Sequence, residues 1–201
     1  FNIKINNIFF DLNCLIHPCC QGLTDEQEMF DNIYNNMIKI INIINPKDLI
    51  YIAIDGVCPR SKIEQQKYRR FRSANEHKLW DTNAISPGTK FMAKLSKKIQ
   101  KAIKEGRFCK HKKIRIILND SSIPGEGEAK IYPYIRQIRC NSDCRFVVYG
   151  MDGDLVILSM LSNKENMYLI REPAQARVYL PKDFCDEKLI IVDIFELLRK
   201  F

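Results

Sequence analysis

The chain has 201 residues, a formal net charge of +8 and 46% hydrophobic residues, which is enough apolar sequence to bury the core of one domain. It contains no run of 18 or more apolar residues, so no membrane-spanning helix is expected, and its start, FNIKINNIFF, lacks the layout of a signal peptide. Without a secretory signal, its eight cysteines are interpreted as reduced thiols of a cytoplasmic protein. A nuclear location is the alternative, although KHKKIR at residues 110–115 is a weak import signal.

Positive charge is concentrated in two segments. Residues 60–78 carry 7 basic and 2 acidic side chains, and residues 90–115 carry 11 basic and 1 acidic, whereas residues 1–59 and 116–201 are net acidic. Basic blocks in a chain with acidic clusters favour a polyanion partner held near bound cations. The alternative is a solvated basic helix face, which Lys-rich helices often present.

Short apolar runs alternate with helical patterns along the chain. The first predicted elements are a strand in NNIFFDLN ending near Asp11, a helix over residues 25–44 stopped by Asn45-Pro46, a strand in LIYIAID ending at Asp55, and basic helices over residues 60–72 and 90–105. These are followed by a strand in IRIILND, a helix over residues 128–139, a strand in RFVVYGMDGD, a helix starting near Asp154, a strand in MYLIRE and a last helix capped by Asp193. Strands that are apolar on both faces and alternate with helices predict an α/β fold with a mostly parallel central sheet flanked by helices.

Six carboxylates follow four of the predicted strands. They are Asp11, Asp55, Glu126, Glu128, Asp152 and Asp154. Because the carboxyl ends of parallel strands form one crevice in which ligands bind, we expect these side chains at one edge of the sheet. For a single acid, such as Glu126 or Asp154, a helix cap or first-turn residue is the favoured interpretation. Acids from four separate stretches favour a shared site instead.

Carboxylates gathered this closely repel one another, and cations relieve the repulsion. Oxygen ligands suit Mg²⁺ or Mn²⁺. Two such ions about 3.5–4 Å apart can promote an in-line displacement at phosphorus, one by generating the attacking hydroxide and the other by stabilising the leaving 3′ oxygen. A structural zinc site is less favoured, because the candidate groups lack paired C-x-x-C spacing. Those groups are Cys140 with Cys144, and Cys14 with His17, Cys19 and Cys20.

The basic segment after Asp55 supplies a second functional pattern. DGVCPRSKIEQQKYRRFR places Lys62, Gln66, Arg69 and Arg70 on one helical face, at i, i+4, i+7 and i+8. Three cations and an amide directed at one spot suit a terminal phosphate, and arginine can contact it bidentately. From spacing alone, an ordinary exposed basic helix is the alternative.

Together, these motifs resemble the Xrn-type 5′→3′ exoribonuclease family of PIN-like, metal-dependent nucleases. The matching stretches are FFDLNCLIH at 9–17, IDGVCPRSKIEQQKYRRFR at 54–72, NAISPGTKFM at 83–92, IPGEGEAKIYPYIR at 123–136, YGMDGDLVIL at 149–158 and MYLIRE at 167–172. The ordered block DGVxPRxKxxQQxxRRFR is highly specific. The chain departs from the family pattern at Cys14, where Gly is common, at Gly153, where Ala is usual, and at Ala129, where His is common. None of these departures removes a proposed ligand.

The resemblance implies that residues 1–201 form one catalytic, PIN/5′-nuclease-like domain, incomplete at both ends relative to the family. It implies processive hydrolysis of 5′-monophosphorylated single-stranded RNA to nucleoside 5′-monophosphates, as in RNA degradation and mRNA decay, with two Mg²⁺ (or Mn²⁺) ions on the six carboxylates. Lys62, Gln66, Arg69 and Arg70 would form the 5′-phosphate pocket. His17 would stack on the terminal base, whereas its sequence context alone favours a buried or capping histidine.

The sequence is also compatible with two other functions. One is a non-catalytic RNA-binding or scaffold protein on a retained nuclease fold, and the other is a flap-type DNA nuclease, a class that shares the acidic crevice. The segment QQKYRRFR argues against the second, because it is suited to a 5′-terminal phosphate.

Overall fold

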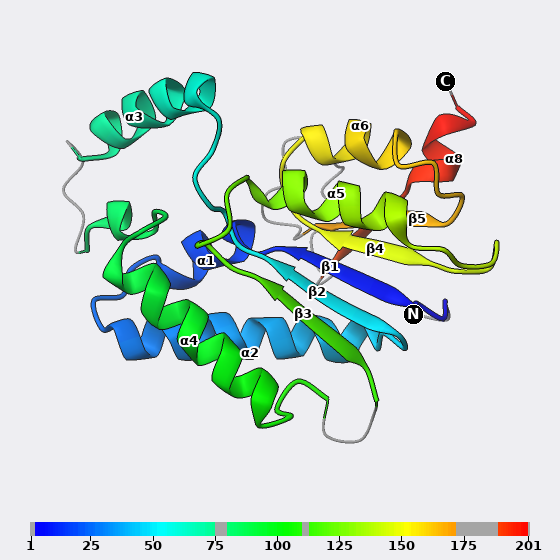
Figure 1. The fold of residues 1–201 in the computed structure, drawn as a ribbon, viewed down its shortest axis with the longest axis horizontal. Coiled ribbons are helices and arrows are strands. Elements are labelled where there is room, and N and C mark those ends of the chain that lie inside the picture. The colour runs from blue at the N-terminus through cyan, green and yellow to red at the C-terminus, as the bar shows by residue number, and fades with distance from the viewer. Residues whose placement is uncertain (1–2, 75–79, 110–112, 172–188, 201) are drawn as a thin grey trace, which may run out of the picture.

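The computed structural model describes residues 3–74, 80–109, 113–171 and 189–200 (Figure 1). Six strands form one sheet in the order β3-β2-β1-β4-β5-β6. The parallel strands are β1 (Asn7–Asp11), β2 (Leu49–Ala53), β3 (Arg115–Asn119), β4 (Phe146–Tyr149) and β5 (Met167–Arg171). β6 (Ile190–Asp193) pairs antiparallel with β5 at the edge. The predicted α/β fold with a mostly parallel sheet is confirmed.

Helices cover both faces of the sheet (Figure 1). One face carries α1 (Asn13–Cys20), α2 (Glu26–Ile44) and α4 (Lys90–Lys104), and the other carries α5 (Gly127–Gln137), α6 (Asp154–Met160) and α8 (Ile194–Leu198). Neighbouring strand residues point to opposite layers: Phe10 belongs to the core under α2 and α4, and Phe9 to the core under α5. This two-sided burial explains why the strands are apolar throughout.

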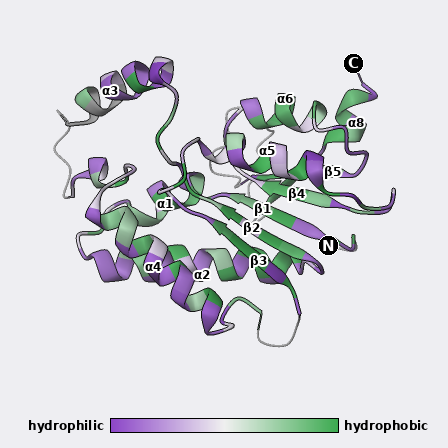
Figure 2. Ribbon diagram, in the orientation of Figure 1, coloured by the Kyte–Doolittle hydropathy of each residue, from purple (hydrophilic) through white to green (hydrophobic). Residues whose placement is uncertain are grey.

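The helix α3 (Arg60–Ala74) and the short 3₁₀ helix η1 (Thr82–Ala84) lie beyond the carboxyl edge of the sheet. Figure 1 shows α3 standing apart from both helical layers. Figure 2 shows hydrophobic residues along the sheet strands, whereas α3 is largely hydrophilic. Such a polar helix has little surface to contribute to a core, so its side chains are available to the site at the sheet edge.

Polar caps define the ends of α2 and the start of α8. The Asp25 side chain accepts a hydrogen bond from the Glu28 N–H at the start of α2, and Asn45 ends that helix in the left-handed region with φ of 52°. Asp193 caps α8 by accepting from the N–H groups of Phe195 and Glu196, which confirms the predicted last cap. None of the described helices is long and apolar enough to cross a membrane.

Several elements differ from the sequence predictions, among them the edge strand β6, which was not predicted. Helix α1 was not predicted, because it is only 8 residues long and contains Pro18. β2 ends at Ala53 rather than at Asp55, because the Asp55 N–H donates to Asn13 Oδ1 and leaves the strand ladder. α5 (Gly127–Gln137) begins one residue before, and ends two residues before, the helix predicted over residues 128–139.

Candidate active site

A cavity of about 970 Å³ lies at the carboxyl edge of the sheet. The segments that follow β1, β2 and β4, together with α3 and the start of α5, supply its walls. The lining includes all six carboxylates predicted from the sequence: Asp11, Asp55, Glu126, Glu128, Asp152 and Asp154. The same cavity is lined by His17, Lys62 and Gln66. The tertiary structure therefore brings together residues from four separate parts of the chain.

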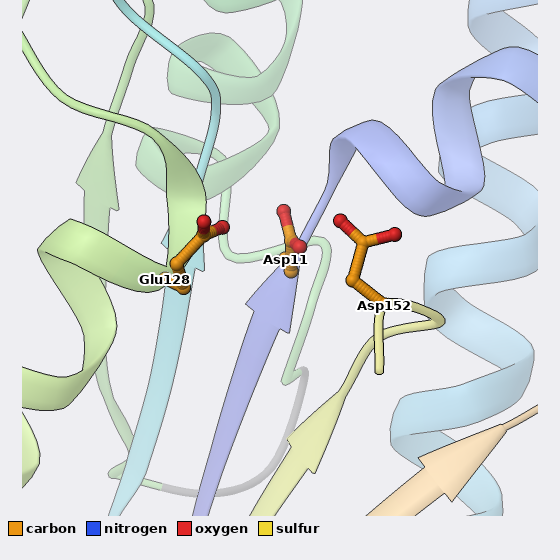
Figure 3. A group of neighbouring side chains, drawn as sticks. All are labelled: Asp11, Glu128 and Asp152. Atoms are coloured by element: carbon orange, nitrogen blue, oxygen red, sulfur yellow. The ribbon is translucent and has the colours of Figure 1, made fainter. Parts of the chain in front are cut away.

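Three of these carboxylates are close enough to share one cation. Asp11, Glu128 and Asp152 each offer an oxygen atom that lies within 4.8 Å of the other two. Figure 3 shows Asp11 at the end of β1, between Glu128 on α5 and Asp152 in the loop after β4. Asp11 is only 3% exposed, and its Oδ1 atom has no hydrogen-bond partner among the described residues.

The cluster is electrostatically costly without a cation. Burial, together with the negative charges of Asp55, Glu128 and Asp152, raises the pKa of Asp11 to about 8. Burial also raises the pKa of Asp55 to about 6, although the hydrogen bond from Gly127 opposes the shift. A bound cation would remove this penalty by stabilising the ionised carboxylates.

The start of α5 holds the acids in place. The Gly127 N–H donates a 2.7 Å hydrogen bond to Asp55 Oδ1, so the positive end of the helix faces that carboxylate. A Cβ atom at residue 127 would overlap Asp11 Oδ1, so any residue other than glycine would force Asp11 or the start of α5 to shift. The loop before the helix is fixed to the loop after β2, because Gly56 donates to the Gly125 carbonyl and Gly125 donates to the Val57 carbonyl.

The helix-cap interpretation of the acids does not hold for Glu126. It is the N-cap residue of α5, but its side chain makes no capping hydrogen bond. Instead, Glu126 Oε2 lies 2.7 Å from Lys62 Nζ, and its Oε1 accepts a 3.3 Å hydrogen bond from Gln66 Nε2. Asp154 lies in the first turn of α6, whose N-cap residue is Gly153, so a favourable helix-dipole contact remains compatible with its position.

The structure describes two of the four side chains predicted to bind the 5′-phosphate. Lys62 and Gln66 face the cavity from α3, and Lys62 Nζ also lies 3.6 Å from Glu128 Oε1. Its hydrogen bond with Glu126 raises the pKa of Lys62, which therefore stays charged. Arg69 and Arg70 belong to α3, but their side chains lie outside the described part of the structure.

His17 is exposed, so the buried interpretation of this histidine is wrong. It lies in the last turn of α1 and lines both the main cavity and a second cavity of about 290 Å³. The zinc alternatives gain no support: within the described ranges, the only group of three or more close metal-ligand side chains is Asp11, Glu128 and Asp152.

A family model matches most of the chain. The description of that model is the N-terminus of XRN 5′-3′ exonucleases, and it matches residues 1–79 and 75–173. The chain belongs to this XRN family.

Similarity to curated proteins supports membership of the XRN family. The 5′-3′ exoribonuclease 2 of Cryptococcus neoformans is 33% identical over 213 aligned residues, which cover 87% of this chain and 19% of that protein. The 5′-3′ exoribonuclease 1 of Saccharomyces cerevisiae is 34% identical, covering 84% of this chain and 13% of that protein. The 5′-3′ exoribonuclease 2 homolog of Drosophila melanogaster is 34% identical, covering 92% of this chain and 25% of that protein. The chain thus spans about a fifth of the length of these relatives.

Sequence reasoning missed a buried lysine beside the acids. Lys130 is 7% exposed, and its Nζ donates to the carbonyl oxygens of Ile54 at 2.7 Å and Asp120 at 2.8 Å. It thereby ties together the segments that follow β2 and β3, and burial lowers its pKa. The feature that could have revealed Lys130 is its position on the buried face of α5, one residue before Ile131. A lysine on a buried face needs internal hydrogen-bond partners.

The departure from the XRN family pattern at Cys14 also has a structural context. Its S–H group donates to Asp11 Oδ2 at 3.5 Å, and its sulfur accepts from the Met151 N–H at 3.3 Å. Burial raises the pKa of this thiol, so it is protonated and serves as a donor to the central acid. Trp80, the only tryptophan of the chain, is a further cavity-lining residue that the sequence did not single out.

Proposed function

We propose that the protein is a 5′→3′ exoribonuclease that hydrolyses 5′-monophosphorylated single-stranded RNA to nucleoside 5′-monophosphates. The observation that carries this proposal is the convergence of Asp11, Glu128 and Asp152 in a cavity that the basic helix α3 also lines. Clustered carboxylates suit metal-assisted phosphodiester cleavage, and adjacent cations suit a phosphate-bearing substrate. Membership of the XRN family, and relatives named 5′-3′ exoribonucleases, support the same reaction.

The acidic cluster fits divalent cations. Asp11 Oδ1 is a buried oxygen that no described protein group satisfies, and it lies between two further carboxylates (Figure 3). A donor set of carboxylate oxygens suits Mg²⁺ or Mn²⁺ better than zinc. We propose that the six carboxylates hold two such ions, which would activate the attacking water and stabilise the charge on the leaving oxygen.

Residues of the chain would bind and orient the RNA end. Lys62 and Gln66, together with Arg69 and Arg70, are proposed to bind the 5′-phosphate from α3. Lys62 also forms ion pairs with Glu126 and Glu128. The proposed phosphate site and the acidic cluster therefore share the ammonium group of Lys62. His17 is proposed to stack on the first base. A 5′-hydroxyl end would leave these cations without their phosphate, and a cap or triphosphate would exceed the pocket.

The direct test is hydrolysis of two RNAs that differ only at the 5′ end. With Mg²⁺, the protein is expected to shorten the 5′-monophosphate RNA from its 5′ end and to release nucleoside 5′-monophosphates, while the 5′-hydroxyl RNA persists. Asp152→Ala should abolish hydrolysis. The matched control is Asp143→Ala, which removes an exposed acid in the loop before β4, and it should leave the rate unchanged.

Other outcomes would favour the remaining alternatives. Equal persistence of both RNAs would contradict the proposal and favour a scaffold function. Preferential cleavage of branched DNA over single-stranded RNA would indicate a flap-type nuclease instead. The cytoplasmic location, with the nucleus as its alternative, stays a prediction that fluorescence microscopy of the tagged protein can test.

A further inference from the structure

Helix α4 carries three exposed lysines directly opposite its buried face. The buried face consists of Phe91, Met92, Leu95, Ser96, Ile99 and Ala102. Lys90, Lys97 and Lys104 are exposed and follow one another at intervals of seven residues, which places them on one line along the outer side. We call these three residues the α4 lysine stripe. With a rise of 1.5 Å per residue, the stripe is about 21 Å long.

The charge of this stripe is not neutralised within the described parts of the chain. Three other lysines of α4 form ion pairs: Lys94 with Glu26, Lys98 with Asp31 and Lys101 with Glu105. None of the three stripe lysines lies within 4 Å of a described carboxylate. Exposed Arg107 and Lys113 extend the positive charge beyond the end of the helix, although Arg107 itself pairs with Glu105. The outer side of α4 therefore presents a surplus of positive charge to solvent.

The stripe begins next to the candidate active site. The second cavity shares His17, Asp55 and Gln66 with the main cavity and extends to Ser86 and Pro87, three residues before α4 starts. Figure 1 shows α4 starting beside η1 near the carboxyl edge of the sheet and running away from that edge. An RNA strand that left the cavity past Pro87 would reach Lys90 first, and then Lys97 and Lys104.

The junction between cavity and helix is structurally defined. Thr89 caps α4 by accepting a hydrogen bond from the Met92 N–H, and its hydroxyl lies within hydrogen-bonding distance of the carbonyls of Ala84 and Ser86. The positive end of the α4 dipole consequently lies at the exit of the second cavity, where it favours a negatively charged group. The start of α4 and the stripe thus form one positively charged surface that begins beside the second cavity.

We propose that the α4 lysine stripe binds the phosphate backbone of an RNA segment that lies outside the cavity. This inference rests on the proposed function and adds a second RNA contact surface to it. The outer side of α4 offers lysine, alanine and glutamine but no aromatic ring, so it contacts phosphates rather than stacking bases. The contact is therefore independent of sequence and strengthens only the binding of RNAs long enough to reach it.

The test compares short and long RNAs on a variant of the stripe. Asp152→Asn prevents hydrolysis and serves as the background for all proteins. The triple variant Lys90→Gln, Lys97→Gln, Lys104→Gln is titrated by fluorescence anisotropy with 5′-monophosphate RNAs of about 4 and about 30 nucleotides. The matched control, Arg136→Gln, Arg139→Gln, Lys200→Gln, removes the same charge from exposed residues of the opposite layer. Circular dichroism checks that each variant is folded.

We expect the triple variant to bind the long RNA about tenfold more weakly at low salt and the short RNA equally well. Each lost phosphate contact removes about 0.7 from the slope of log affinity against log salt for single strands, so the slope should fall by about 2. The control should change neither quantity.

An unchanged slope and affinity of the triple variant would overturn the role of the stripe and leave the proposed function intact. Equal weakening of the short RNA would place the effect in the cavity and also overturn it. If the background protein binds neither RNA, the proposed function and the stripe fail together. A loss with the long RNA in the control variant as large as in the stripe variant would show that only net charge matters.

Discussion

The backbone N–H of Gly127 and the Oδ1 atom of Asp55 are joined by a 2.7 Å hydrogen bond. The first residue of α5 thereby holds the acid that follows β2, and it also lies against Asp11, because a Cβ atom at position 127 would overlap Asp11 Oδ1. One glycine therefore sets the distance between two of the proposed ligands. This relationship makes residue 127 a sensitive point for testing the geometry of the site.

Gly127→Ala is expected to displace Asp11 or α5 and to cost about 1–3 kcal/mol of stability, the usual range for overpacking. Affinity for Mn²⁺, measured by electron paramagnetic resonance, should fall at least tenfold, because two ligands move apart. Gly153→Ala is the control, since a Cβ atom there meets nothing within 4 Å. Normal metal binding by folded Gly127→Ala protein would show that this close approach is not needed.

Lys130→Met should destabilise the protein by about 1–3 kcal/mol, because it leaves the buried carbonyl of Ile54 without its donor. The Asp120 carbonyl loses one of its two donors and keeps the Ile123 N–H. Urea denaturation measures the loss. Lys130→Arg, which keeps a cationic donor, should recover part of it, and Lys39→Met on the exposed side of α2 should have little effect. A midpoint of Lys130→Met equal to that of the unmodified protein would contradict this prediction.

The stability of the metal-free protein should fall as the pH rises. The pKa of Asp11 is raised from 3.8 to about 8 in the folded state, so between these pH values the folded protein holds a proton that the unfolded chain has lost. The stability that protonated Asp11 contributes is fully present below pH 3.8 and is lost as the pH rises toward about 8. The melting temperature should decrease from about pH 5 to about pH 8, and Asp11→Asn should flatten the decrease.

A divalent cation should reverse that loss, because it replaces the proton on the cluster. The increase in melting temperature on adding Mg²⁺ is expected to be larger near pH 8 than near pH 5 and to vanish on chelation. A cation effect of equal size in Asp11→Asn would indicate binding elsewhere.

Lys62→Met is expected to reduce the preference for 5′-monophosphate over 5′-hydroxyl RNA by about tenfold, equivalent to about 1.4 kcal/mol. The reason is that Lys62 lines the cavity, lies 2.7 Å from Glu126 and is one of the proposed phosphate ligands. The ratio of kcat/KM for the two RNAs measures the change. Lys67→Met on the exposed side of α3, where Lys67 pairs with Glu64, should leave the ratio unaltered; a similar decrease there would assign the effect to general charge.

Much of the fold could be predicted because its signals are local. Apolar strands separated by amphipathic helices predict a parallel sheet. The helical spacing of the apolar residues in α2 predicts that helix without any tertiary information. α1 and β6 escaped prediction for physical reasons. α1 is short and contains Pro18, and an antiparallel edge strand carries no pattern that distinguishes it from the helix start it precedes.

The sequence by itself determined which acids follow strands, and the parallel-sheet rule then predicted that Asp11, Asp55 and the later pairs would share one edge. Only the tertiary structure decided which of them converge and what surrounds them. Asp11, Glu128 and Asp152 form the tight group, Glu126 turns to Lys62, and Lys130 is buried beneath the site. Spacing along the chain reports the direction of a side chain, whereas burial, pKa and ion pairing depend on neighbours that are distant in sequence.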